Sequence, residues 1–240
     1  MDDDLRRATF DRADAHLAAT TADELTAAIP ACEGWDVARL LRHLGRAQRW
    51  AVLALAAEPD APIPDPPRPG PDEDPVDWYR QGAAQLNAAL ESTDLDRPVT
   101  TWIGTQTARW WARRMTHEAV IHALDVADAT GRPFAVDPSA AVDGVDELLE
   151  VFLPHRFALA DFGPAGETVH LHATDTEGEW LLTFTAEGVD VEQRHAKGDV
   201  AARGAALDLL GLLWSRRTPE ALEVFGDADI LDRYQRAAAY

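Results

Sequence analysis

The spacing of apolar side chains predicts helices along the first part of the chain. Apolar residues recur every three or four positions, as on the buried face of a helix, and predict helices at about 3–17, 36–56, 76–91, 107–130 and 138–153. Asp36 is placed to cap the second helix, and Gly131 followed by Pro133 is placed to end the fourth. Prolines are frequent over residues 59–75, and proline lacks a backbone donor, so we expect a loop that connects helices of one domain.

The pattern changes to alternation in the C-terminal part of the chain. Apolar and polar residues alternate as in strands with one buried face, which predicts strands at about 169–173, 180–184, 189–191 and 200–203. Helical spacing returns at about 205–216 and 227–237. The sequence therefore predicts an α+β fold, in which an up-down helical bundle at residues 1–160 is followed by a small α+β domain at residues 161–240.

Composition narrows the functions that the chain can have. Of its 240 residues, 46% are hydrophobic and 27% are charged, which is ordinary usage for a globular protein. Its 42 acidic and 22 basic side chains give a formal net charge of -20, so a phosphate backbone or an anionic membrane surface would be repelled. We therefore expect no nucleic-acid partner and no membrane partner.

Cysteine usage and hydropathy indicate a cytoplasmic protein. Cys32 is the only cysteine, which excludes an intramolecular disulfide and fits a reducing compartment. The first residues lack the apolar stretch of a signal peptide, and the longest apolar run, from Trp50 to Ala57, is too short to span a membrane.

The fourth predicted helix carries the clearest chemical signal. Glu118 and His122 are four residues apart, so both project from the same face of that helix. His117 precedes His122 by five residues and lies about 140° away around the helix, so the segment is not the His-Glu-x-x-His motif of zinc proteases.

A third metal ligand would come from a facing helix, as is usual in helical bundles. His43 is the natural candidate, because it lies close to the apolar stripe of the second predicted helix. Two histidines and one glutamate with a fourth position open are typical of catalytic zinc. The spacing alone leaves an alternative, in which His43 is a hydrogen-bonded core residue and Glu118 pairs with Arg114 one turn earlier.

These segments resemble the mycothiol-dependent maleylpyruvate isomerase family. The similar segments are Cys32–Val37, Leu40–Leu44, His117-Glu118 with His122 and Asp125, and Asp143–Glu147. Glu33 departs from the family, which usually has proline there, but this position is in a turn outside the metal set. The resemblance covers nearly the whole chain and implies a DinB-like bundle joined to a domain related to sterol-carrier-protein folds.

The resemblance also implies a site and a chemistry. His43, Glu118 and His122 would bind Zn²⁺ or another divalent metal, and mycothiol would be the co-substrate. A thiol bound to zinc is deprotonated at neutral pH and becomes a nucleophile. An arginine of the C-terminal domain would act near the site, and Arg216 or Arg217 is the plausible counterpart; the alternative is a cation that stabilises a helix C-terminus.

The predicted activity is that of a zinc-dependent isomerase or thiol S-transferase acting on a small electrophile. Two alternatives stay open: a non-catalytic module that binds a metal or a small ligand, and a zinc hydrolase that uses metal-bound water. A thiol requirement for turnover separates these alternatives from the first hypothesis. We expect a monomer or a weak homodimer.

Other residues of interest have simpler structural interpretations. Asp125 is either a partner that orients His122 or a surface acid. His170 and His172 share one face of a predicted strand and could in principle bind a metal. We expect that face instead to be simply the polar one, because Val169 and Leu171 are on the other. The aromatic residues Trp50, Trp110 and Trp111 are expected in the bundle core.

Overall fold

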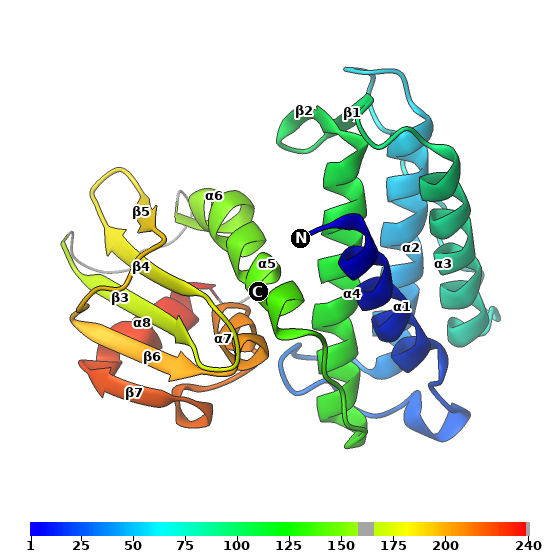
Figure 1. Cartoon of the computed structure of the whole chain (residues 1–240). Helices are drawn as coiled ribbons and strands as arrows, with labels where there is room; N and C mark the ends of the chain where they lie inside the picture. Colours follow the sequence, from blue (N-terminus) through cyan, green and yellow to red (C-terminus); the bar gives the residue numbers. More distant parts are fainter. Residues whose placement is uncertain (158–165, 239–240) are drawn as a thin grey trace. The chain divides into compact units, whose positions relative to one another are not determined.

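The chain folds into two compact units. A computed structural model describes residues 1–157 and 166–238, and the units comprise Asp2–Phe134 and Ala135–Tyr240 (Figure 1). The domain boundary predicted at 160/161 lies outside the described residues. The second unit includes helix α5 (Pro138–Glu147), which packs against helix α7 (Ala206–Leu213) within it. Among the described residues, no helix is long and apolar enough to cross a membrane.

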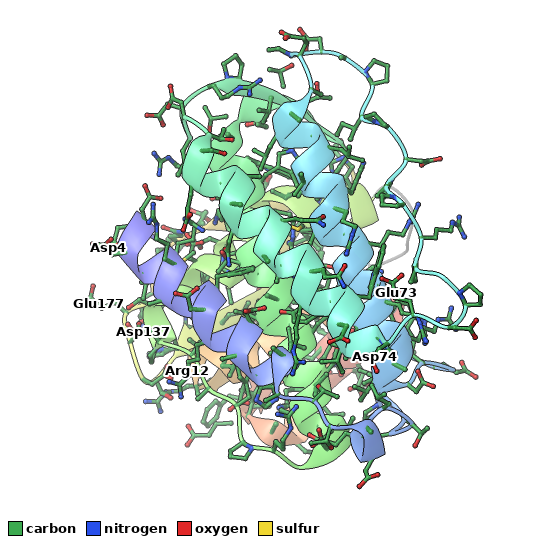
Figure 2. The ribbon with its side chains drawn as sticks, turned by 90° about the vertical axis from the view of Figure 1, so that its right-hand side faces the viewer. Asp4, Arg12, Glu73, Asp74, Asp137 and Glu177 are labelled. Carbon is green, nitrogen blue, oxygen red and sulfur yellow. The ribbon has the colours of Figure 1, made fainter. Side chains whose placement is uncertain are left out.

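The first unit is the predicted bundle of helices. Its elements are α1 (Asp3–Ala18), α2 (Val37–Ala56), α3 (Pro75–Ser92), the strands β1 (Pro98–Thr101) and β2 (Gly104–Thr107), and α4 (Ala108–Thr130). Caps set the helix ends as predicted: the Asp36 carboxylate accepts the Arg39 backbone N–H at 2.7 Å, and Gly131 ends α4 with a left-handed φ of 73°. Asp74 likewise caps α3, at the start of that helix in Figure 2.

Helices α2 and α3 run parallel to each other. Arg49 in α2 donates to the carbonyl of Trp78 near the start of α3, whereas Arg97, just after α3, donates to the carbonyl of Leu55 at the end of α2. A parallel neighbour requires a return along the bundle, and the proline-rich segment 57–74 provides it along the outside of the helices (Figure 2). Extended chain advances about 3.3 Å per residue, so this segment easily spans the roughly 30 Å of α2.

Helices α1 and α4 form the second parallel pair. Their first turns are joined by the ion pair of Arg109 with Asp3 at 2.7 Å, and their last turns by Arg132, which donates to the carbonyl of His16 at 3.1 Å. Helix α4 runs antiparallel to α2, because the His43 ring meets that of His122, whereas Trp50, later in α2, meets Trp111, earlier in α4. This direction brings the middle of α4 beside the first turns of α2.

Two glycines allow α2 and α3 to approach closely. A methyl group on Gly45 would lie 2.5 Å from Cδ1 of Trp78, and one on Gly82 would lie 3.0 Å from the carbonyl oxygen of Gly45. Trp78 fills the resulting space, and the Arg49 guanidinium stacks over its ring at 3.5 Å. The contact between the two helices therefore depends on the absence of side chains at these positions.

The second unit is a mixed sheet with helices. It contains α5, a π-helical turn (Leu148–Phe152), α6 (Leu153–Phe157), β3 (Thr168–Ala173), β4 (Glu179–Phe184), β5 (Val189–Glu192), β6 (Val200–Gly204), α7, β7 (Glu223–Gly226) and α8 (Ala228–Ala238). The strand order is β5-β4-β3-β6-β7, in which β3 and β6 are parallel and the other neighbours antiparallel. Helices α7 and α8 pack on the sheet and lie behind it in Figure 1.

The structure confirms the predicted helices and strands and also contains elements that were not predicted. The β1–β2 hairpin and strand β7 were not predicted. Helix α7 is shorter than predicted and ends at Leu213, because Ser215 adopts a left-handed φ of 58° and the Arg216 N–H turns back to the carbonyl of Gly211. The arginines that follow α7 therefore lie in a turn and not in the helix.

Replacing Gly82 or Gly45 with alanine tests the close packing of α2 on α3. Alanine favours a helix over glycine by about 1 kcal/mol, so a permissive position would become more stable. We expect each variant instead to lose about 1–3 kcal/mol in the free energy of unfolding, measured by urea denaturation, because the methyl group overpacks the interface. Gly70→Ala, whose methyl would come no closer than 3.9 Å to a neighbour, is the control. Unchanged or increased stability of Gly82→Ala would contradict this account.

Candidate metal centre

The antiparallel contact of α2 and α4 brings together His43, Glu118 and His122. Oε1 of Glu118 lies 3.1 Å from Nε2 of His43 and 3.4 Å from Nε2 of His122. The two imidazole rings meet edge to face, with centroids 5.2 Å apart. The three residues singled out by spacing and resemblance thus form one cluster, although His43 is 75 positions from Glu118 in the sequence.

The donor atoms of this cluster fit a divalent metal ion. One ligand atom from each of the three residues lies within 4.8 Å of the others. Ligands about 2.0–2.1 Å from a tetrahedral zinc are separated from each other by about 3.3 Å, so small side-chain adjustments suffice. Imidazole nitrogen and carboxylate oxygen are also the donors that zinc and related divalent ions accept.

The two carboxylate oxygens of Glu118 have different partners. Oε1 faces both histidines, whereas Oε2 accepts a hydrogen bond from Nη2 of the buried Arg114 at 3.2 Å. The Glu118–Arg114 pair, which the sequence offered as an alternative to a metal site, therefore exists beside the histidine cluster. It fixes the carboxylate with one oxygen free to face the rings.

Asp125 orients the ring of His122 from behind. Its Oδ2 lies 2.9 Å from Nδ1 of His122, and its side chain is 1% exposed, so it is not a surface acid. A carboxylate on one ring nitrogen fixes the tautomer and directs the other nitrogen toward a ligand. Here Nε2 is the nitrogen that faces Glu118.

The hydrogen bonds of the cluster shift two pKa values. Burial acts to raise the pKa of the Glu118 carboxyl, but its contacts with His122 and His43 outweigh burial and hold that pKa well below its usual range. Burial acts to lower the pKa of His122, but Asp125 and Glu118 raise it to about 9. In metal-free protein a proton therefore supplies the positive charge between these two carboxylates.

The cluster is open to solvent on the side of His43. The side chain of His43 is 41% exposed, compared with 22% for Glu118 and 10% for His122. The indole of Trp35, in the turn before α2, meets the His43 ring edge to face at 5.2 Å, and Arg39 stacks over that indole. The cluster therefore faces solvent on the side of His43.

An aromatic group lies further along the same helices. Trp50 follows His43 by seven residues and Trp111 precedes Glu118 by seven, so both lie about 10 Å along the helices on similar faces. The ring of Trp102, from the β1–β2 hairpin, stacks on Trp50 at 5.8 Å and meets Trp110 at 4.5 Å. Trp111 is fully buried, as expected of a core residue, but Trp102 is 40% exposed. Trp102 was missed because no hairpin was predicted there.

The two candidate arginines lie in the turn after α7, in the second unit. Nη1 of Arg216 donates to the carbonyl of Trp214 at 2.7 Å, and Nη1 of Arg217 donates to the carbonyl of Arg216 at 3.1 Å. Arg217 also pairs with Asp208 at 3.5 Å. Both side chains are half-buried. Their role in a reaction stays a prediction.

Fold and site together define a class: a helical-bundle protein with a solvent-accessible His-Glu-His cluster, joined to a small α+β unit. Residues 6–127 match the family model of the mycothiol maleylpyruvate isomerase N-terminal domain, and residues 139–233 match that of the MDMPI C-terminal domain. The chain belongs to the mycothiol-dependent maleylpyruvate isomerase family. A comparison with curated protein sequences found no match.

Solved structures support the fold. A crystal structure of the mycothiol-dependent maleylpyruvate isomerase has a TM-score of 0.62, and one of its histidine-to-alanine mutant has 0.63. Each is 15% identical to this chain, and each match covers 92% of this chain and 90% of the other. A structure described as UbiJ-SCP2 Ubiquinone synthesis protein has a TM-score of 0.31 and 19% identity and covers 42% of this chain and 94% of its own, a score too low to argue from.

Asp125→Asn tests the orienting role of Asp125 in metal-free protein. We expect NMR titration to give His122 a pKa of about 9 in the parent and a lower value, nearer the ordinary 6.5, in the variant, because a favourable contact with the imidazolium is lost. The stabilising contribution of this proton is complete below about pH 6.5 and disappears as the pH rises through 9. Asp128→Asn, at an exposed carboxylate on the same helix, is the control. Equal pKa values in parent and Asp125→Asn would contradict the role.

Proposed function

We propose that this chain is a metal-dependent enzyme that uses a low-molecular-weight thiol, mycothiol by family membership, to act on a small electrophile such as maleylpyruvate. The observation that carries the proposal is the convergence of His43, Glu118 and His122 on one point that is accessible from solvent. We further propose that the protein works in the cytoplasm.

The chain's own residues would prepare the site for a cation. His43 and His122 would offer Nε2, and Glu118 would offer Oε1, to Zn²⁺ or another divalent ion. Such an ion lowers the pKa of a coordinated thiol and so supplies a thiolate at neutral pH. Asp125 would hold the His122 ring in place, and Arg114 would hold Glu118. The exposed side of His43 would leave room for the thiol.

The attacking sulfur must come from outside the chain under this proposal. Cys32 is the only cysteine, and it lies in the turn before α2, half-buried. The family association with mycothiol supports an external thiol instead. After attack on the electrophile, release of the thiol would give isomerisation, whereas its retention would give an S-transferase. We propose isomerisation, following the family.

Two other functions make different demands. A zinc hydrolase that uses metal-bound water would work without a thiol. A non-catalytic module would bind the metal or a small ligand without turnover. The thiol requirement of turnover therefore separates the three.

The test is metal content and turnover in the parent and in His43→Ala. His43 is exposed, so its replacement spares the core. We expect untagged His43→Ala to hold about one equivalent of metal less than the parent in elemental analysis and to lose mycothiol-dependent isomerisation of maleylpyruvate. We expect the same losses of metal and of turnover in His122→Ala. His155→Ala, which removes an exposed histidine from α6, should match the parent.

Each unfavourable outcome points to a different function. Turnover by the parent that continues without any thiol would identify a hydrolase and contradict the thiol proposal. Metal binding at His43 without turnover of thiol and electrophile would favour the binding module. A parent that holds no metal at this cluster, even after incubation with zinc, would overturn the proposal.

Replacement of the C-terminal arginines tests whether either binds a substrate carboxylate. A bidentate charged pair is worth about 1.5–3 kcal/mol, so Arg216→Met should lower kcat/KM roughly 10- to 100-fold, mainly through KM. Arg217→Met is the matched comparison, because Arg217 already pairs with Asp208 and its loss should act mainly on stability. A reversed pattern would assign the role to Arg217, and unchanged kinetics in both variants would contradict any role in binding.

A further inference from the structure

A second cluster of side chains that could hold a metal ion belongs to the second unit, and the proposed reaction does not use it. Oε2 of Glu179 is 3.1 Å from Nε2 of His170 and 2.7 Å from Nδ1 of His195. One ligand atom from each of these three residues lies within 4.8 Å of the others. His172 is beside them, with Nδ1 3.5 Å from Oε1 of Glu179. We call these four residues the sheet cluster.

Strand pairing explains how the sheet cluster forms. His170 and His172 are two positions apart in β3, so both project from one face of the sheet. His172 is paired in register with Glu179, the first residue of the antiparallel strand β4. His195 comes from the connection between β5 and β6, residues 193–199. Two neighbouring strands and one connection therefore supply the ligands.

We propose that His170, Glu179 and His195 bind a divalent ion of the late first-row transition metals, zinc foremost, with His172 as a fourth available ligand. Imidazoles with one carboxylate suit zinc, nickel and copper better than magnesium or calcium, which prefer oxygen ligands. The site would be independent of the one built from His43, Glu118 and His122.

The buried His170 and the exposed His195 together suit the capture of a metal ion from solvent. His170 lies on the polar face of β3 as predicted, but it is only 5% exposed. The side chain of His195 is 79% exposed, and His172, Glu179 and His195 line an open hollow of about 610 Å³. An ion can therefore enter from solvent and reach a ligand that the fold already fixes.

The connection that carries His195 is anchored near its other end. The Asp199 carboxylate accepts hydrogen bonds from the backbone N–H and the hydroxyl of Thr168, at the start of β3. A methyl group on Gly198 would lie 2.9 Å from the backbone nitrogen of His170, so the connection passes close to β3. A metal at the sheet cluster would fasten the connection to β3 and β4 at a second point.

Hydrogen bonding alone is the competing explanation of the same contacts. A carboxylate between imidazoles needs no metal, and the same distances would serve a set of hydrogen bonds. The two explanations differ in one measurable respect. If the cluster is a metal site, removal of one ligand residue lowers the amount or affinity of bound zinc. If it is only a set of hydrogen bonds, the same removal leaves zinc binding unchanged.

The experiment measures zinc binding to the untagged full-length chain by equilibrium dialysis and elemental analysis. His195→Ala removes an exposed ligand, so folding should persist. We expect it to hold one equivalent less than the parent, or to bind that equivalent at least about 10-fold more weakly. His43→Ala with His122→Ala should retain the sheet-cluster equivalent, and His155→Ala should match the parent.

Thermal denaturation gives a second readout that is independent of activity. A ligand that binds the folded state raises Tm, so zinc should raise Tm less in His195→Ala than in the parent. The doubly substituted His43→Ala, His122→Ala chain should keep the His195-dependent part of this shift. Equal zinc content and equal zinc-dependent Tm shifts in His195→Ala and the parent would overturn the sheet-cluster proposal. Loss of zinc confined to the His43 and His122 variants would overturn it while leaving the proposed function intact.

Discussion

The partly buried carboxylate of Glu118 is the constraint on which the helical unit's site depends. A carboxylate largely removed from water costs free energy unless charged and hydrogen-bonding partners surround it. Glu118 has partners on two sides, Arg114 on its own helix and the imidazoles of His122 and His43. Arg114 and His122 are in α4 with Glu118, but His43 is in α2. His43 reaches Glu118 only if α2 lies antiparallel to α4 with the correct axial position along it. The hydrogen bonding of this carboxylate therefore depends on the register of α2 on α4.

That register depends on packing away from the site. Trp78 packs against Gly45, two residues after His43, and its indole N–H donates to the carbonyl of Arg42 at 3.1 Å. A shift of α2 against α3 would therefore move His43 relative to α4. The parallel direction of α3, made possible by the long proline-rich return, places Trp78 at this level of the bundle. Residues outside the histidine cluster thus position His43 within it.

The sequence predicts the parts of this structure whose signals are local. Helix periodicity, the Asp36 cap and the glutamate–histidine spacing in α4 are each contained in one segment, and the structure confirms the helices and the shared face of Glu118 and His122. The strands β3, β4 and β5 are predicted for the same reason, because alternation of apolar and polar residues is local.

Other features arise from pairings that no single segment encodes. The parallel direction of α2 and α3 follows from tertiary packing, and the β1–β2 hairpin is too short and polar to show a strong period. The alternation of β3 places His170 opposite Val169 and Leu171 correctly, but it cannot show that the strand register adds Glu179 or that a later connection adds His195. Two histidines on one strand face indicate only a polar face. Four side chains that converge, three histidines and one glutamate, favour a metal site instead.

The two histidine clusters share a donor set but differ in their surroundings, which gives them different expected properties. Around His122, Asp125 and Arg114 fix the ligand ring and the carboxylate from behind, and such outer partners raise affinity and sharpen geometry. In the sheet cluster the strands fix His170 and Glu179, while His195 extends from a connection and is mostly exposed. Metal binding by His195 would order the connection of residues 193–199, so part of the binding free energy would be lost to the entropy of ordering that connection. The helical cluster thus suits a metal that stays bound while ligands exchange at it, and the sheet cluster suits one whose binding stabilises the local fold.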